Sequence, residues 1–275
     1  MYKLKKDSTK NLFKVAALFS MLFILIFVGL STVTVAEGER SKQLDIENLF
    51  NGKDGTMILK NLKNDNMYVY NIPRSKKRFT PESTFKVPNS LIGLETNVLR
   101  DEYEVKRWDS IEREFENWNR DHTLASALRE SAIWFYQDMA REIGDKKMLE
   151  YMNLIGYGNK DISGGIDTFW LNSSLKISAM EQIEFMEDLI EEDLPFKEKN
   201  HKVVKRMMIL DEQDDYTIHG KTGTRLSDMG LGWFVGFIET DKETWIFAVN
   251  IDGSGTEAKN ITTEVLMQKG LIERK

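Results

Sequence analysis

A serine and a lysine three positions apart, Ser83 and Lys86, stand in the stretch TPESTFKVPN at residues 80–89. Thr80 is a favourable N-cap residue, and Pro81 suits the first position of a helix. The stretch therefore predicts a helix start, with Ser83 in the first turn and Lys86 on the same face one turn later. Such a pair is either a nucleophile with its base or two solvated residues of a polar turn.

The nucleophile interpretation sets a requirement on the lysine. A serine hydroxyl attacks when a base takes its proton, and a lysine with the reference pKa of about 10.4 is protonated at neutral pH. Lowering the pKa of Lys86 by about three units corresponds to about 4 kcal/mol, which burial can supply and a helix N-terminus can assist. If Ser83 is a nucleophile, Lys86 must lose its charge.

Two further motifs bear on this choice. S-A-I at residues 131–133 lies within a helical pattern, and K-T-G-T at residues 221–224 lies at the end of a strand pattern. Each has a simple structural explanation, a helix hydroxyl bonded to a preceding carbonyl and an edge-strand turn. The order S-x-x-K, S-x-I, K-T-G favours chemistry instead, because together the motifs supply a nucleophile, a base, a proton shuttle and a cation for a carboxylate. S-x-x-K and K-T-G occur together in penicillin-binding proteins and class A β-lactamases.

Over residues 45–272 the sequence resembles the class D β-lactamases, the oxacillinase group. The segments that carry the resemblance are STFKVPNSLIGLET from Ser83, WD at 108–109, SAI at 131–133, YGN at 157–159, ISGGIDTFWL at 162–171, KTGT at 221–224 and WFVGF at 233–237. The class A marker S-D-N is absent. The resemblance implies a serine hydrolase that opens β-lactams, penicillins and oxacillin-type compounds among them, through an acyl-serine.

The resemblance also implies roles for the motif residues. In the class D family the S-x-x-K lysine is carboxylated by CO2, and the resulting carbamate is the general base. Ser83 would then be the nucleophile and Lys86 the carboxylated base. Ser131 would pass a proton to the lactam nitrogen, while Lys221 would tune that transfer and attract the substrate carboxylate. CO2 or bicarbonate is the one small molecule expected at the site, with no metal and no other cofactor.

Other residues match supporting positions of the family. Trp170 matches the tryptophan whose indole N–H bonds the carbamate, although without the motif order it reads as a core residue. Ile133 matches the apolar neighbour that keeps the carbamate dry. The backbone N–H groups of Ser83 and Thr224 would form the oxyanion hole. The pocket wall would be completed by Leu171 and residues 157–159.

One segment, EAKNITTEVL, departs from the family pattern. Many members have an arginine there that binds the substrate carboxylate, and Ala258 stands at that position. Substrate binding then rests on Lys221, Thr222, Gly223 and Thr224, with Lys259 or Arg225 as a further cation. A lysine in place of the arginine would lose the planar, bidentate geometry of a guanidinium.

The elements that must position these motifs are strands near both ends of the chain and helices between them. Residues 56–72 predict a β-hairpin around an Asn/Asp turn, and YTIHGKTGT, LGWFVGFIE and TWIFAVNID predict three sequential antiparallel strands. The middle of the chain, including LASALRESAIWFYQDMAREIG, has helical periodicity, as do residues 256–270. We therefore predict an α+β fold of the α/β sandwich type, with an antiparallel central sheet, flanking helices and a helical subdomain.

Residues 1–36 differ from the rest of the chain. Five lysines are followed by a mostly apolar run at residues 15–36, which is typical of a signal peptide or a retained membrane anchor. We expect residues 37–275 to be one extracytoplasmic catalytic domain, secreted or linked to the membrane by this segment alone. Residues 37–80 and 200–275 would form its sheet part and residues 81–199 its mainly helical part. The chain has no cysteine, so disulfides and cysteine-linked lipids are excluded.

Charge and composition exclude two other kinds of site. The chain is formally −6, and residues 1–36 carry five lysines against Asp7, which leaves −10 on the remainder. An acidic body would repel nucleic acid, so none is expected as a partner. The only histidines are His122, His201 and His219, and their spacing does not suit a zinc site.

Two related functions share the same serine chemistry. A membrane-linked penicillin sensor would be acylated without turnover, but such sensors carry a polar residue at the Ile133 position and an H-E-x-x-H motif that this chain lacks. A penicillin-binding transpeptidase would also use Ser83, whereas Trp170 and Ile133 favour an enzyme that hydrolyses its acyl-serine. Steady turnover of nitrocefin distinguishes the hydrolase from the sensor.

Overall fold

The computed structural model describes residues 41–273, and the predicted signal peptide or anchor at residues 1–36 lies outside the described residues. Of these, residues 43–273 belong to one compact unit. Within the described part of the chain, no helix combines the length and the apolar character needed to cross a membrane.

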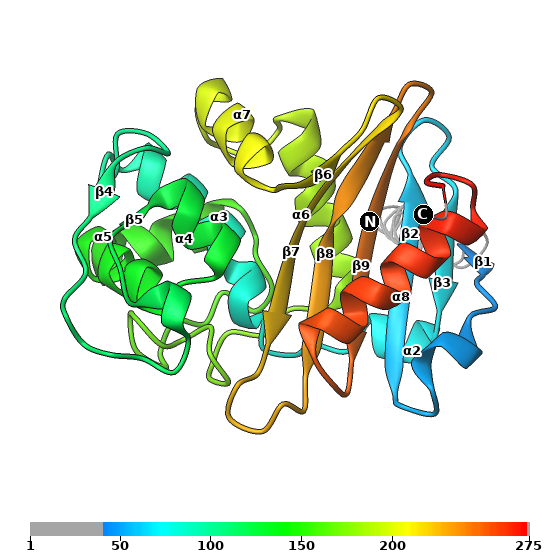
Figure 1. The fold of residues 1–275 in the computed structure, drawn as a ribbon, viewed down its shortest axis with the longest axis horizontal. Helices are drawn as coiled ribbons and strands as arrows, with labels where there is room; N and C mark the ends of the chain where they lie inside the picture. The colour runs from blue at the N-terminus through cyan, green and yellow to red at the C-terminus, as the bar shows by residue number, and fades with distance from the viewer. Residues whose placement is uncertain (1–40, 274–275) are drawn as a thin grey trace, which may run out of the picture. The chain divides into compact units, whose positions relative to one another are not determined.

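The central sheet has seven strands in the order β1-β3-β2-β9-β8-β7-β6 (Figure 1). Its strands are β1 (Ser41–Gln43), β2 (Gly55–Asn61), β3 (Met67–Tyr70), β6 (Ile209–Glu212), β7 (Tyr216–Thr224), β8 (Gly232–Thr240) and β9 (Thr244–Ile251). The pairings from β3 across to β6 are antiparallel. β2 pairs with β9, so strands from both ends of the sequence meet at the middle of one sheet, and the predicted fold class is confirmed. A separate two-stranded sheet joins β4 (Val105–Lys106) to β5 (His122–Thr123).

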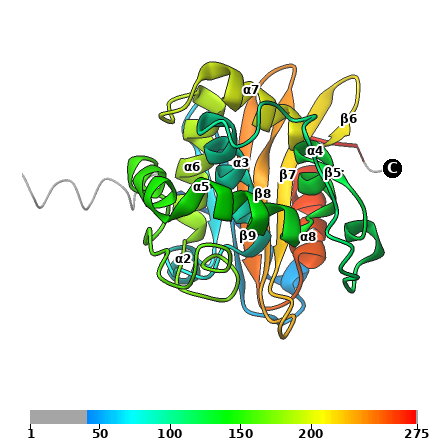
Figure 2. The same ribbon diagram turned by 90° about the vertical axis from the view of Figure 1, so that its left-hand side faces the viewer.

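Helices cover both faces of the sheet. The α-helices are α2 (Ile72–Ser75), α3 (Lys86–Glu95), α4 (Leu124–Glu130), α5 (Ile133–Leu154), α6 (Ala179–Glu191), α7 (Glu198–Met207) and α8 (Gly255–Gln268). Short 3₁₀ helices are η1 (Glu47–Phe50), η2 (Glu82–Phe85) and η3 (Glu116–Trp118). Figure 2 shows α6 and α8 on opposite sides of the strands, and Figure 1 shows α3 and α5 beyond the β7 end of the sheet. The arrangement is a three-layer sandwich with the helical part beside β7.

The alternation along β8 explains why the sheet has two cores. Trp233, Val235 and Phe237 point into the larger core, which the middle helices complete. Phe234 and Ile238 point into the smaller core beneath α8. Successive side chains of a strand face opposite sides, and both faces of this one are buried. The apolar run of β8 therefore fits a central strand.

The helical stretch predicted over residues 124–144 is broken at Ser131, and it ends at Gly144. Ser131 ends α4 in the left-handed conformation, with φ 59° and ψ 32°, and Ala132 is extended before α5 begins. Gly144 has φ 76° and interrupts the second helix. The apolar periodicity continues across both breaks because each helix packs on the same core, so the pattern alone did not reveal them.

Candidate active site

Ser83 lies in the short 3₁₀ helix η2, and Lys86 is the first residue of α3. The predicted cap at Thr80 is wrong, because η2 begins at Glu82, and Thr80 instead donates its hydroxyl proton to the Glu82 carboxylate at 2.6 Å. The 3₁₀ turn keeps residues three apart on one side of the helix. The side chains of Ser83 and Lys86 therefore still meet, as the spacing predicted.

Lys86 is fully buried, and its Nζ lies 2.8 Å from Ser83 Oγ. The amine also lies 5.4 Å from the centre of the Tyr136 ring. Burial lowers the pKa of Lys86 well below its ordinary value, the charge of Lys221 lowers it further, and the nearby Glu82 carboxylate opposes the change. A neutral amine is thus favoured beside the hydroxyl, which meets the requirement set for a base.

Ser131 and Lys221 form a second hydroxyl–amine pair. Lys221 Nζ donates to Ser131 Oγ at 3.0 Å and to the carbonyl of Thr222 at 2.8 Å. The left-handed conformation of Ser131 at the end of α4 turns this residue out of the helical series. Burial lowers the pKa of Lys221 to about 7, so this amine can exchange a proton near neutral pH.

Gly223 brings β7 close to the turn that carries Ser83. A Cβ at position 223 would lie 3.1 Å from the carbonyl oxygen of Pro81 and 3.3 Å from Ser83 N. Only a glycine allows this approach without displacing the turn. On the opposite side of the strand, the N–H of Gly255 at the start of α8 donates to the Thr224 hydroxyl at 2.9 Å. The strand end is held from both faces.

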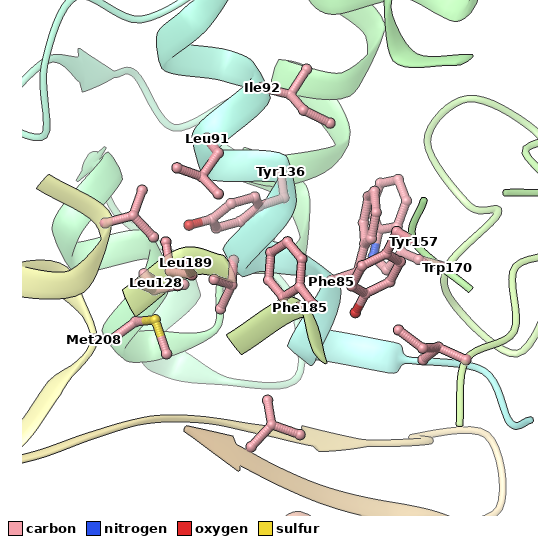
Figure 3. Packing of buried hydrophobic residues seen from close by; sticks show 14 of the residues in the cluster. Phe85, Leu91, Ile92, Leu128, Tyr136, Tyr157, Trp170, Phe185, Leu189 and Met208 are labelled. Carbon is pink, nitrogen blue, oxygen red and sulfur yellow. The ribbon is translucent and has the colours of Figure 1, made fainter. Parts of the chain in front are cut away.

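Trp170 lies against the same turn. Its carbonyl accepts a hydrogen bond from Glu82 N at 3.0 Å, and its ring stacks on Phe85 with centroids 5.4 Å apart. Figure 3 shows Trp170, Phe85 and Tyr157 together in this core. The side chain is fully buried, yet its indole N–H has no hydrogen-bond partner among the described residues. A buried donor of this kind is costly unless an acceptor reaches it.

The other residues predicted to support the base or to form the pocket wall lie partly in the core and partly in loops. Leu171 is half-buried and packs on the large core, and Ile133 is half-buried at the first position of α5. Tyr157 packs in the core against Phe85. Asn159 joins two loops, since its side chain donates to the carbonyl of Ser174 at 2.9 Å and accepts from the N–H of Lys176 at 2.9 Å.

The two candidate cations for a carboxylate are separated. Ala258 is fully buried in the core beneath α8. Lys259 lines a cavity of about 430 Å³ on that same face, together with Ile218 and Phe234. Arg225 directly follows the K-T-G-T segment, pairs with Asp228 at 2.8 Å, and its charge acts on the carboxyl of Glu82 beside the serine. Arg225 therefore follows the strand end that carries Lys221, whereas Lys259 lines the cavity beneath α8.

Two residues near the site were not singled out from the sequence. Glu82 precedes the serine and is 2% exposed, and Tyr136 of α5 is fully buried with its hydroxyl 2.9 Å from Ser90 Oγ. The signal for Glu82 was present, a carboxylate directly before the candidate nucleophile. Among residues 41–273 no group of three or more histidine, aspartate or glutamate side chains is arranged to hold a metal ion.

Comparison with known proteins places this geometry in a family. The model of the penicillin-binding protein transpeptidase domain matches residues 47–268. The chain is 55% identical over 250 residues to the probable β-lactamase YbxI of Bacillus subtilis (strain 168), covering 89% of this chain and 94% of that protein. It is 36% identical over 265 residues to the β-lactamase OXA-48 of Klebsiella pneumoniae, covering 94% and 99%.

Solved structures agree. The class D β-lactamase BAT-2 superimposes with a TM-score of 0.83 at 59% identity, over 84% of this chain and 98% of that one. A class D β-lactamase from Bacillus subtilis gives a TM-score of 0.83 at 57% identity, again over 84% and 98%.

Proposed function

The chain belongs to the class D β-lactamases, hydrolases of the penicillin-binding transpeptidase superfamily that open β-lactams, and on that premise we propose that Lys86 is carboxylated and serves as the general base for Ser83. The observation that carries this is the pairing of a fully buried amine, whose pKa is lowered by that burial, with the hydroxyl 2.8 Å away. CO2 combines with an uncharged amine, so the low pKa of Lys86 makes it a suitable acceptor.

The residues around Lys86 fit the added group. The indole N–H of Trp170 is a buried donor without a partner among the described residues, and it belongs to a ring stacked on Phe85, the neighbour of Lys86. As a carbamate, Lys86 would supply an anionic oxygen base that accepts a hydrogen bond from this N–H. Ile133 and Leu171 are the apolar side chains that we propose to keep water from it.

Acylation follows from the positions of the chain's own groups. Ser83 Oγ attacks the lactam carbonyl carbon as its proton leaves toward Lys86, and the C–N bond of the ring breaks. We assign the oxyanion to the backbone N–H groups of Ser83 and Thr224, which Gly223 brings together. Ser131 Oγ delivers a proton to the departing nitrogen, and Lys221, 3.0 Å from that hydroxyl, restores it. Water then hydrolyses the acyl-serine.

The substrate carboxylate has cationic and hydroxyl partners at the end of β7. Lys221 pairs with Ser131, the Thr222 and Thr224 side chains lie at the same strand end beside Gly255, and Arg225 adds a planar guanidinium. We propose that Arg225 takes the role of the arginine that Ala258 replaces, because Lys259 lines the cavity beneath α8. Substrates would be penicillins and oxacillin-type compounds, whose carboxylate such a group recognises.

The test is hydrolysis of nitrocefin with and without added bicarbonate, followed by the intact mass of the protein. Sustained turnover that bicarbonate increases, with no lasting acyl adduct, supports the proposal. A single stoichiometric burst with a stable adduct would instead identify a penicillin sensor, and turnover indifferent to bicarbonate after decarboxylation at low pH would refute the role of Lys86.

We further propose that the catalytic unit is extracytoplasmic. The support is the lysine-rich start and apolar run of residues 1–36. Fractionation of expressing cells, with the N-terminal mass of the recovered protein, separates a cleaved signal peptide from a retained anchor. Recovery in the cytoplasmic fraction with residues 1–36 intact would contradict this.

A further inference from the structure

Glu82 is a buried acid next to the nucleophile, and the mechanism above does not use it. It is 2% exposed and directly precedes Ser83. Its φ of 51° lies in the left-handed region, which non-glycine residues seldom adopt. Strained backbone at a functional turn persists when surrounding contacts hold it. The contacts of Glu82 are therefore the feature to examine.

Glu82 forms hydrogen bonds to the backbone on both sides of Leu171, the residue that follows Trp170. Its backbone N–H donates to the carbonyl of Trp170 at 3.0 Å, and its side-chain Oε1 accepts from the N–H of Asn172 at 2.9 Å. Asn172 is itself left-handed, with φ 45°. These two bonds clamp a three-residue segment whose middle is Leu171, so the backbone on either side of that residue is fixed to the serine turn.

The carboxylate is oriented from the sheet as well. Thr80 donates its hydroxyl proton to Glu82 Oε1 at 2.6 Å, and the carbonyl of Thr80 accepts from the indole N–H of Trp233 in β8 at 2.9 Å. A continuous chain of hydrogen bonds thus runs from the sheet through Thr80 and Glu82 to Asn172. The carboxyl group of Glu82 therefore ties the Asn172 end of this segment to the sheet.

Burial makes the ionised carboxylate of Glu82 unfavourable at this position. Burial raises the pKa of Glu82, and the bonds from Thr80 and Asn172 and the charges of Arg225 and Lys86 oppose that rise. An apolar residue at this position would avoid the burial of a carboxyl. The cost indicates that the two hydrogen bonds accepted by Oε1 have a use beyond packing.

We propose that Glu82 is a positioning residue for deacylation, which holds the Trp170 segment so that the indole N–H meets the base at Lys86. This rests on the proposed role of Lys86 and Trp170. The ring of Trp170 has a stacking contact with Phe85 but no polar contact of its own among the described residues. The direction of the indole N–H therefore depends on the packing of the ring against Phe85 and Phe169 and on the anchor of its backbone. Loss of the hydrogen bonds accepted by the Glu82 side chain therefore weakens the hydrogen bond from Trp170 to the base more than it displaces Ser83.

The test compares Glu82→Gln, which keeps the acceptor oxygen, with Glu82→Ala, which removes it. Rates of acylation and deacylation are measured separately by stopped flow with nitrocefin and by intact mass, at several bicarbonate concentrations. We expect Glu82→Ala to slow deacylation by about tenfold or more, since small misplacements of a catalytic group have effects of this size. Acylation should change less, the bicarbonate requirement should rise, and Glu82→Gln should restore most of the deacylation rate.

Two results would overturn the proposal. One is a Glu82→Ala enzyme whose acylation and deacylation fall together with its melting temperature, which is a merely structural effect. The other is unchanged deacylation in that variant. If Glu82→Ala does not fold, Thr80→Val removes one of the two donors to Oε1 and must show the same selective loss, in smaller measure. A wild-type enzyme without bicarbonate-dependent turnover refutes the proposed function itself, independently of either variant.

Discussion

Lys86 Nζ lies 2.8 Å from Ser83 Oγ in a position closed to solvent, so the amine that would activate the serine is also the amine that burial deprives of its proton. The position of Lys86 thus brings its amine within hydrogen-bonding distance of the serine and also lowers the pKa of that amine. The hydrogen bond alone would leave a protonated lysine beside an inert hydroxyl.

Replacing Lys86 with methionine should abolish both steps. The change removes the base and keeps an unbranched side chain of similar length, so acylation and turnover should fall by about 10² to 10⁴-fold. Stopped-flow nitrocefin assays measure this, with the exposed Lys147→Met as matched control. A Lys86→Met enzyme that is acylated at the wild-type rate would contradict the assignment.

Two substitutions of Trp170 distinguish the role of its indole N–H from the role of its ring. Trp170→Phe keeps an aromatic stack on Phe85 and removes the indole donor, whereas Trp170→Ala removes both. Both variants should deacylate at least about tenfold more slowly and require more bicarbonate, since a donor to a charged group is lost. Trp170→Ala should also lose about 3 kcal/mol or more of stability. Normal deacylation by Trp170→Phe would show that the orphaned N–H has no catalytic part.

Lys221 should make stability depend on pH. Its pKa falls from 10.5 to about 7 on folding, so between these values the unfolded chain binds a proton that the folded protein does not. The free energy of unfolding should therefore rise with pH through this window, by about 1.4 kcal/mol per unit from this lysine. In the uncarboxylated protein, Lys86, whose pKa is also lowered, adds to the same slope.

Urea unfolding at a series of pH values from 7 to 9.5 checks the prediction. Lys221→Met should flatten the rise by about the stated amount, and Lys147→Met should not. Equal slopes in wild type and Lys221→Met would mean that Lys221 keeps its charge on folding.

Arg225 and Lys259 make opposite predictions for substrate binding. Arg225→Ala should raise KM for penicillins about tenfold, in keeping with the loss of a charged hydrogen-bonding partner worth about 1.5 kcal/mol. Lys259→Ala changes a residue of the cavity beneath α8 and should leave KM unchanged. The reverse result would assign carboxylate binding to Lys259 and remove Arg225 from the site.

Gly223→Ala tests the close approach of β7 to the serine turn. The new methyl group would press on Pro81 O and Ser83 N at 3.1 and 3.3 Å, so the turn must move by a few tenths of an ångström. We expect a loss of about 1 to 3 kcal/mol in stability and a larger relative loss of acylation rate. Denaturant titration and stopped flow measure the two. Unchanged acylation would show that the oxyanion site does not depend on this contact.

The order of the sequence motifs predicted the site better than helical periodicity and capping residues predicted the local structure. Ser83, Lys86, Ser131 and Lys221 were identified from residue types in sequence, and the structure brings each hydroxyl to its amine. The sheet was predictable because the aromatic and β-branched runs of β7, β8 and β9 leave little choice of element. The break at Ser131 was not, since a left-handed residue between two helices leaves the apolar periodicity intact.

Properties that depend on three-dimensional packing were the ones missed. Lys259 follows Ala258 in the sequence, but successive residues of a helix point about 100° apart. The side chain of Lys259 therefore lines the cavity beneath α8, while Ala258 is buried in the core. The clamp by Glu82 joins residues 90 positions apart, which no local pattern indicates. The cap assigned to Thr80 failed because its hydroxyl has a stronger partner in that same carboxylate.

The burial of Lys86 has a consequence for following the folding of this protein. Ser83 and Lys86 are neighbours in any conformation, but the lysine becomes a base only after the helical part has closed over it and Lys221 of β7 has arrived beside it. An incompletely folded chain holds an ordinary ammonium next to an unreactive serine. The onset of β-lactam hydrolysis during refolding would therefore report when the native site has formed, and would time the docking of β7 onto the helical part.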